Sequence, residues 1–156
     1  MKTLIWGLLQ QHVSRSNPID KDQLRPVIKI SGLDALVDTG AETCVCNLPA
    51  AIIPAIFTIK SQQKDYIYGL CEKKDTKEEI EKCKIKGTTF VVGDFQIERL
   101  HFKNLKLFVP DNRLVIAQKF IIGADVWRKF VCTIDPFEHE ITLKRLQDDL
   151  IIDMDA

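Results

Sequence analysis

The sequence lacks a long apolar run, an excess of charge of one sign and any Cys-x-x-Cys pair. Lys plus Arg and Asp plus Glu each number 22, which argues against a broad electrostatic grip on nucleic acid or on an anionic membrane. No apolar run is long enough to span a bilayer. The stretch from Leu4 to Leu9 faintly resembles the core of a signal peptide, but it is short and no small-residue cleavage site follows it. We therefore expect no nucleic-acid partner and no membrane association.

The five cysteines are odd in number, and their spacing fits neither a disulfide framework nor a zinc site. Cys44 and Cys46 would point to the same face of a strand, but no nearby cluster of Cys or His completes a metal site. We therefore predict buried or half-buried thiols in a reducing compartment, with no metal.

The rest of the composition is ordinary for one globular domain, because 46% of the 156 residues are apolar and 28% are charged. Local composition divides the chain into a flanking segment at 1–23, a domain at 24–145 and an acidic tail at 146–156. Within the domain, residues 60–84 form a charged insertion. Its Lys and Glu residues recur at (i, i+4) spacing, which predicts a short solvated helix or a mobile excursion.

The β-prone segments are short and are separated by turn residues such as Ser31-Gly32, Gly93-Asp94 and Pro110-Asp111-Asn112. One or two helical turns are expected at 124–130, and 131–134 with 140–143 reads as a hairpin. The pattern predicts an all-β, barrel-like domain with one short helix near the C-terminus. The other strand candidates are 27–30, 35–37, 43–46, 88–92 and 120–122.

Asp38-Thr39-Gly40 is the triplet that carries the most chemical information. It follows the apolar residues Ala35-Leu36-Val37, so the carboxylate can project from the end of a rigid strand. Gly40 permits a turn that a side chain would obstruct, and the Thr39 hydroxyl can fix the loop by hydrogen bonds. Taken alone, the triplet also fits a solvated surface turn, so the interpretation depends on its context.

This context resembles the retropepsin family, the homodimeric aspartic proteases of reverse-transcribing viruses and retrotransposons. The resemblance covers about residues 24–145, and Cys44-Val45-Cys46 with the Pro-containing stretch behind it looks similar to plant pararetroviral proteases. The matching segments are Arg25-Pro26-Val27-Ile28-Lys29-Ile30, Ala35-Leu36-Val37-Asp38-Thr39-Gly40-Ala41-Glu42, Ile121-Ile122-Gly123-Ala124-Asp125 and Glu140-Ile141-Thr142-Leu143.

The resemblance implies a closed β-barrel subunit and an active site to which two identical subunits each contribute Asp38. The two carboxylates would share one proton, so that one activates a water and the other donates to the peptide carbonyl oxygen. Thr39 would brace the two loops, and Gly40, Ala41 and Glu42 would contact the substrate. The sequence also favours a homodimer because it contains no second Asp-Thr/Ser-Gly. No metal or cofactor is needed.

The family also closes a mobile hairpin, the flap, over the bound peptide. Ile85-Lys86-Gly87-Thr88-Thr89 is the first candidate, so Lys86 and Gly87 would contact the substrate together with Ile122, and Tyr68-Gly69 is the competing flap. Three departures from the family pattern stand out, and the first is that the stretch between Asp38 and the flap candidate is longer than in compact family members. Ala124 occupies the position where Arg often follows the late glycine, which removes an ion pair to Glu42, and the flap lacks the usual cluster of glycines.

Several other residues are assigned structural roles. Asp125 is expected to cap the following helix rather than to act in catalysis, and His12, His101 and His139 are scattered. Leu4 to Leu9 and Ile141 to Leu143 could form an intersubunit sheet, and a short amphipathic helix over Leu4 to Val13 is the alternative. The flanking segment and the tail could also be polyprotein flanks that the enzyme removes.

The predicted function is therefore an aspartic endopeptidase that processes its own viral or retroelement polyprotein, in the host-cell cytoplasm or in the virus particle. Two alternatives stay open. One is a catalytically silent retropepsin-like module for dimerisation or peptide binding, and the other is a cellular protease with this domain.

Overall fold

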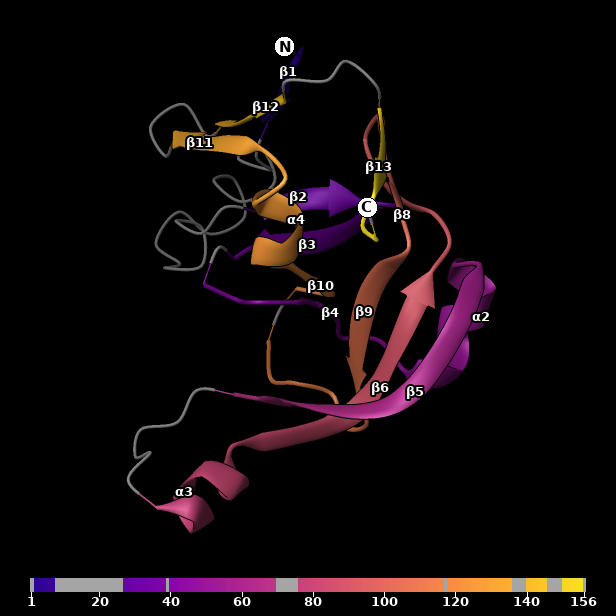
Figure 1. Cartoon of the computed structure of the whole chain (residues 1–156), viewed down its shortest axis with the longest axis vertical. Helices are drawn as coiled ribbons and strands as arrows, with labels where there is room; N and C mark the ends of the chain where they lie inside the picture. The colour runs from indigo at the N-terminus through magenta and orange to yellow at the C-terminus, as the bar shows by residue number, and fades with distance from the viewer. Residues whose placement is uncertain are drawn as a thin grey trace.

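The computed structural model describes residues 2–7, 27–38, 40–69, 76–116, 118–135, 140–145 and 150–155, which form a mostly β structure of three sheets (Figure 1). The helical segments are η2 (Ala50–Ile52), α2 (Ile53–Ile56), α3 (Lys77–Lys82) and α4 (Ala124–Trp127). The all-β class is thus confirmed, and α4 is the predicted short helix. The strands are β1 (Lys2–Gly7), β2 (Val27–Ile30), β3 (Leu33–Val37), β4 (Cys44–Cys46), β5 (Ile59–Tyr68), β6 (Lys84–Val92), β7 (Phe95–Ile97), β8 (Leu100–Lys103), β9 (Leu105–Pro110), β10 (Phe120–Ile122), β11 (Val131–Asp135), β12 (Glu140–Arg145) and β13 (Ile151–Asp153).

The largest sheet has seven strands in the order β2-β3-β10-β4-β9-β6-β5. β10 pairs in parallel with β3 and antiparallel with β4, so a strand from late in the chain lies between two strands that are consecutive in sequence. β4 pairs in parallel with β9 on its other side. The order leaves β2 and β5 as free edges, and no closed barrel is found among the strands that the structure describes.

The turn between β2 and β3 follows directly from its two residues. Ser31 and Gly32 both adopt positive φ, 51° and 80°, which is the conformation of a two-residue turn whose twist matches that of the flanking strands. The register places Ile30 opposite Leu33. This turn, predicted from Ser31-Gly32, sets the position of β3 and hence of Asp38, which follows that strand.

A cluster of three aromatic rings fixes β10 in the core. Phe57, which follows α2, stacks on Phe95 of β7 with ring centroids 5.4 Å apart. Phe120 of β10 meets both rings edge-on, at 6.3 Å and 5.8 Å. Burying an aromatic side chain of this size contributes about 2 kcal/mol, so the cluster anchors the start of β10 firmly.

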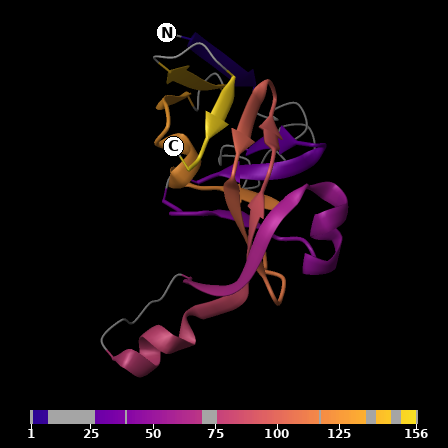
Figure 2. The ribbon, with the colours of Figure 1, turned by 45° about the vertical axis from the view of Figure 1, so that its right-hand side comes forward.

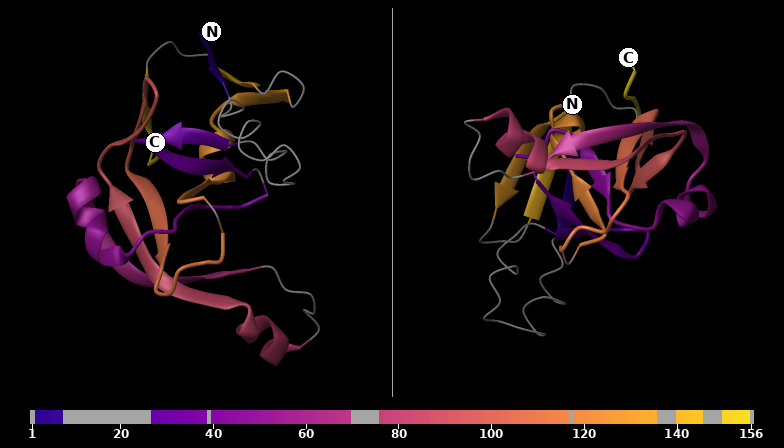
Figure 3. Two further views of the ribbon diagram at one scale, coloured as in Figure 1. Left: turned by 180° about the vertical axis from the view of Figure 1, so that it is seen from behind. Right: turned by 90° about the horizontal axis from the view of Figure 1, so that it is seen from below.

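β5 and β6 form a long antiparallel hairpin that extends beyond the rest of the sheet. β9 pairs with β6 only as far as Gly87, which lies opposite Pro110, whereas β5 and β6 continue to Tyr68 opposite Lys84. Residues 65–69 and 76–86 are called the distal hairpin below. Figures 1, 2 and 3 all show it projecting from the body of the molecule, with α3 at its end.

The charged insertion predicted at 60–84 proves to be two different structures. α3 is the short solvated helix, with the Thr76 hydroxyl accepting a hydrogen bond from Glu79 N at 3.1 Å as its N-cap. Residues 59–68, in contrast, are a full strand of the main sheet. Sequence patterning missed this strand because most of its side chains are exposed on both faces, so apolar and polar residues do not alternate.

Both ends of the described chain belong to the fold. β1 pairs antiparallel with β12 of the same chain, with Trp6 opposite Ile141, so the amphipathic helix considered for this segment is wrong for residues 2–7. The remainder of that segment lies outside the described residues. β13 pairs in parallel with β8 and buries Ile152, so part of the predicted acidic tail is a strand of the sheet that contains β7 and β8.

The cysteines follow the prediction only in part. Cys44, Cys46 and Cys132 are free thiols, and the first two are buried. Cys83, at the end of α3, is disulfide-bonded, so the prediction of a free thiol is wrong at this position. Among the helices that the structure describes, none has the length and apolar character to cross a membrane.

Candidate active site

Asp38 directly follows β3 and begins a tight turn. Its backbone N–H donates to the Ile122 carbonyl at 3.0 Å, and its own carbonyl accepts from Ala41 N at 3.2 Å. Gly40 N donates to Asp38 Oδ1 at 2.9 Å, so the turn holds its own carboxylate. Thr39 lies outside the described residues. For Oδ2 of the half-buried Asp38, the described part of the chain supplies no hydrogen-bond partner.

Gly40 is needed at its position for space. A Cβ atom there would lie 3.3 Å from Asp38 Oδ1, closer than most real Cβ contacts. A side chain would therefore crowd the carboxylate and disturb the N–H that holds it.

The turn is attached, residue by residue, to the segment that follows β10. Ala124 N donates to the Ala41 carbonyl at 2.6 Å, and Asp125 N donates to the Glu42 carbonyl at 3.3 Å. Gly123 makes this approach possible, because a Cβ atom there would lie 2.5 Å from the Thr43 carbonyl oxygen. The two segments on which the family resemblance rests most strongly thus lie side by side.

Ile122 supports the site through its backbone. Its carbonyl accepts from Asp38 N and also from Trp127 Nε1 at 2.7 Å, so both lone pairs of this oxygen are used. Its side chain has no exposed surface in the single chain. This burial does not fit the predicted contact between Ile122 and a substrate, and it makes the residue part of the core.

The other predicted substrate contacts have different surroundings. The Glu42 side chain is exposed and Ala41 is half-buried, while the backbone carbonyls of both residues are bound to α4. Lys86 is exposed on β6. Gly87 is buried within the same strand, where a Cβ atom would lie 2.3 Å from the Val109 carbonyl oxygen. Gly87 is therefore required by close packing and not by a turn.

This placement corrects the position of the predicted flap. Residues 85–89 lie inside β6, paired with β5 throughout and with β9 from Gly87 onward, so they do not form the end of a hairpin. The end is formed by the chain between Tyr68 and Lys84. The competing candidate, Tyr68-Gly69, lies at its start, with Gly69 N bonded to the Cys83 carbonyl at 2.8 Å.

Cys44 and Asp125 form a side-chain contact that sequence reasoning missed. Cys44 Sγ donates to Asp125 Oδ1 at 3.2 Å, and the same oxygen accepts from Val126 N at 2.9 Å. Gly123, not Asp125, occupies the N-cap position of α4, so the predicted capping role of Asp125 is wrong. The contact joins residues far apart in the sequence, and only the packing of α4 against β4 brings them together.

The two buried thiols near the turn are poor nucleophiles. Burial, together with the nearby Asp125 charge, raises the pKa of Cys44 well above its usual range. Burial also raises the pKa of Cys46 to about 12. Because the thiolate is the reactive form, both groups stay protonated and unreactive at neutral pH.

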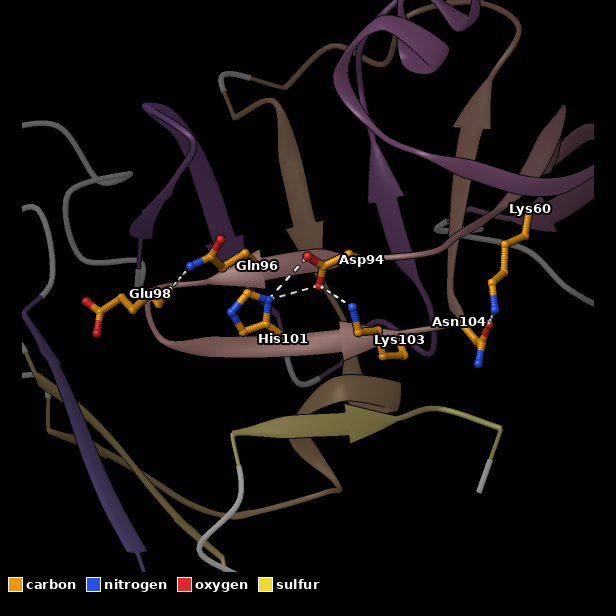
Figure 4. A network of polar contacts seen from close by, with 7 residues as sticks. All are labelled: Lys60, Asp94, Gln96, Glu98, His101, Lys103 and Asn104. Carbon is orange, nitrogen blue, oxygen red and sulfur yellow. Dashed lines mark hydrogen bonds and ion pairs between the residues drawn. The ribbon is translucent and has the colours of Figure 1, made fainter.

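A second polar cluster lies on the β7–β8 hairpin (Figure 4). His101 Nδ1 lies 3.1 Å from Asp94 Oδ1, and Lys103 Nζ lies 3.4 Å from the same oxygen. All three side chains are partly exposed, so solvent weakens both contacts. Among the described residues, no group of three or more His, Cys, Asp or Glu side chains could hold a metal ion.

Comparisons with protein-family models, with curated proteins and with solved structures returned no match for this chain. The site must therefore be interpreted from its own residues and geometry.

Proposed function

We propose that this chain is one subunit of a homodimeric, retropepsin-like aspartic endopeptidase, with Asp38 as its catalytic carboxylate. The observation that carries the proposal is the turn itself. A half-buried carboxylate stands at the end of a core strand, on a turn held by backbone hydrogen bonds to Ile122 and α4. Such support places the carboxylate reproducibly, which catalysis by proton transfer demands.

The chemistry needs two such carboxylates. The chain has one Asp-Thr-Gly, so the second carboxylate is that of an identical subunit, with the two turns meeting at a two-fold axis. Two carboxylates in contact cannot both ionise at low cost, so the pair holds one proton. The ionised oxygen takes a proton from water, the water attacks the peptide carbonyl carbon, and the protonated carboxyl donates to the carbonyl oxygen.

The proposed substrate is a polypeptide, namely the polyprotein of a reverse-transcribing virus or retroelement, cut in the host cell or in the particle. The sequence segments similar to retropepsins support this substrate class. The Asp38 turn supports the reaction but does not select a peptide sequence. No described side chain therefore defines a cleavage preference.

The test compares the wild type with Asp38→Asn on a chain that includes flanking polyprotein sequence. Fragments are identified by mass spectrometry from mildly acidic to neutral pH, at several protein concentrations. Loss of the catalytic carboxylate is expected to lower the rate by roughly a thousandfold or more. The rate per subunit should rise with concentration if the site requires a dimer.

The matched control is Asp94→Asn, which removes a partly exposed carboxylate from the β7–β8 hairpin. It should cut as fast as the wild type. Equal cutting by Asp38→Asn and wild type would remove Asp38 from the mechanism. Absence of cutting by any folded variant at every concentration would leave the silent peptide-binding module as the better account.

A further inference from the structure

The contact between Cys44 and Asp125 joins β4 to α4, whose first two residues are bonded to Ala41 and Glu42 beside Asp38. Cys44 is the first residue of β4, has no exposed surface, and donates from Sγ to Asp125 Oδ1 at 3.2 Å. One buried side chain of β4 therefore binds the carboxylate of Asp125, which belongs to the segment that supports the turn.

A short series of contacts leads from this thiol to the catalytic carboxylate. Asp125 N is bonded to the Glu42 carbonyl, and Ala124 N is bonded to the Ala41 carbonyl. Ala41 N in turn closes the turn on the Asp38 carbonyl. Any shift of α4 relative to β4 would therefore move the atoms that hold Asp38.

The thiol is suited to this role because it stays protonated. Burial raises the pKa of Cys44 well above its usual range, and the neighbouring Asp125 charge raises it further. The donor is thus present throughout the neutral pH range. Ala124 offers no side-chain donor, so the hydrogen bonds described between the two segments come from backbone groups and from this thiol.

We propose that Cys44 and Asp125 are positioning residues that hold the Asp38 turn through α4. This inference rests on the proposed function for its effect on catalysis, but its structural part can be measured without activity. Neither residue touches the substrate. Their effect is on the geometry, and therefore on the turnover rate, of the Asp38 pair.

The experiment compares Cys44→Ala and Cys44→Ser with Cys46→Ala in the full chain. Cys46 lies on the same strand and is equally buried, but its thiol is contacted by the Leu48 backbone and not by Asp125. Both alanine variants remove the same atoms from the core, so both should lower global stability alike. Cys44→Ser keeps a donor and serves as the conservative rescue.

The first measurement is the amide hydrogen exchange of Ala124 and Asp125, the two groups bonded to the Ala41 and Glu42 carbonyls. Cys44→Ala should speed their exchange about fivefold more than Cys46→Ala does. Without the thiol, the closed state has one hydrogen bond fewer, so local opening costs less free energy. Cys44→Ser should restore most of the protection. Equal exchange in the two alanine variants would overturn the inference.

The second measurement separates kcat from KM in the cleavage assay. Cys44→Ala should lower kcat about fivefold with KM within about twofold, and Cys44→Ser should recover it. If exchange is selective but no variant cuts, the proposed function fails while the positioning contact stands. If the wild type cuts through Asp38 and both alanine variants behave alike, only the positioning role fails.

Discussion

The Asp38 turn and the distal hairpin both connect strands, yet they are held in opposite ways. Asp38, Ala41 and Glu42 of the turn are bonded to a segment far away in sequence, through Ile122, Ala124 and Asp125. The distal hairpin pairs mainly with itself. Its side chains Tyr66 and Tyr68 are 46% and 53% exposed, and their rings pack on each other with centroids 5.5 Å apart.

This difference separates a region that must stay in place from one that is free to move. Long-range hydrogen bonds to a buried strand tie the turn to the global unfolding of the core. The hairpin has few buried apolar contacts, and α3 buries no residue, so it can open locally at low cost. The proposed catalytic carboxylate, Asp38, lies in the first kind of environment.

Truncating one large aromatic residue in each region should give the largest contrast. Trp127→Ala removes a ring that is 3% exposed and whose Nε1 binds the Ile122 carbonyl, so it should cost about 3–5 kcal/mol of unfolding free energy. Tyr68→Ala should cost about 1 kcal/mol or less. Urea unfolding followed by circular dichroism measures both. Similar costs would show that the hairpin is as well supported as the site.

Glycine substitutions test the same contrast at the backbone. Gly123→Ala places a Cβ atom against the Thr43 carbonyl and should destabilise the fold by about 1–3 kcal/mol while separating the turn from α4. Gly93→Ala is the control, because its Cβ atom would meet Thr58 at the ordinary distance of 3.5 Å. It should change stability by less than about 0.5 kcal/mol. A Gly123→Ala protein as stable as Gly93→Ala would contradict the close approach.

Much of the site could be predicted because its information is local. The apolar strand before Asp38, the glycine inside the turn and the Ile-Ile-Gly segment are each visible within a few residues. The Ser31-Gly32 turn is equally local, since its two positive φ angles depend on those residues alone. The hairpin of β11 and β12 was found for the same reason.

The rest depended on packing between distant segments. Gly87 has the sequence context of a turn, but its place between β5 and β9 makes it a close-packing residue, and nothing within the neighbouring residues distinguishes the two. β13 was missed because its apolar run, Leu150 to Ile152, is only three residues long and lies within an acidic stretch. The contact of Cys44 with Asp125 likewise exists only once α4 lies against β4.

The smallest expected effect is a pH dependence at the base of the distal hairpin. Thr89 Oγ1 donates to Asp65 Oδ2 at 2.7 Å, and Tyr66 N donates to the other oxygen at 2.8 Å. These bonds lower the pKa of Asp65, the Thr89 bond most strongly. Thr89→Val removes that donor, so the pKa of Asp65 should rise toward its ordinary value without reaching it. A carboxyl ¹³C NMR titration measures the change.

The effect on stability has a definite sign. Because the folded-state pKa of Asp65 is lowered, its stabilisation is present above the unfolded-state value of about 3.9 and is lost as the pH falls through the folded-state value. The difference in unfolding free energy between wild type and Thr89→Val should therefore shrink as the pH falls through that range. It should stay below about 0.5 kcal/mol, since solvent screens this partly exposed group.

Asp153 provides the internal control for this titration. Its pKa is also lowered, by Asn104 Nδ2 and Asp155 N, in a sheet that Thr89 does not contact. The Asp153 resonance should titrate identically in both proteins. If the pKa of Asp65 does not move, Thr89 does not bind that carboxylate in solution. The base of the hairpin is then held to the sheet more loosely than this hydrogen bond indicates. The boundary between the fixed and the movable region would then lie closer to Gly87 and the end of β9.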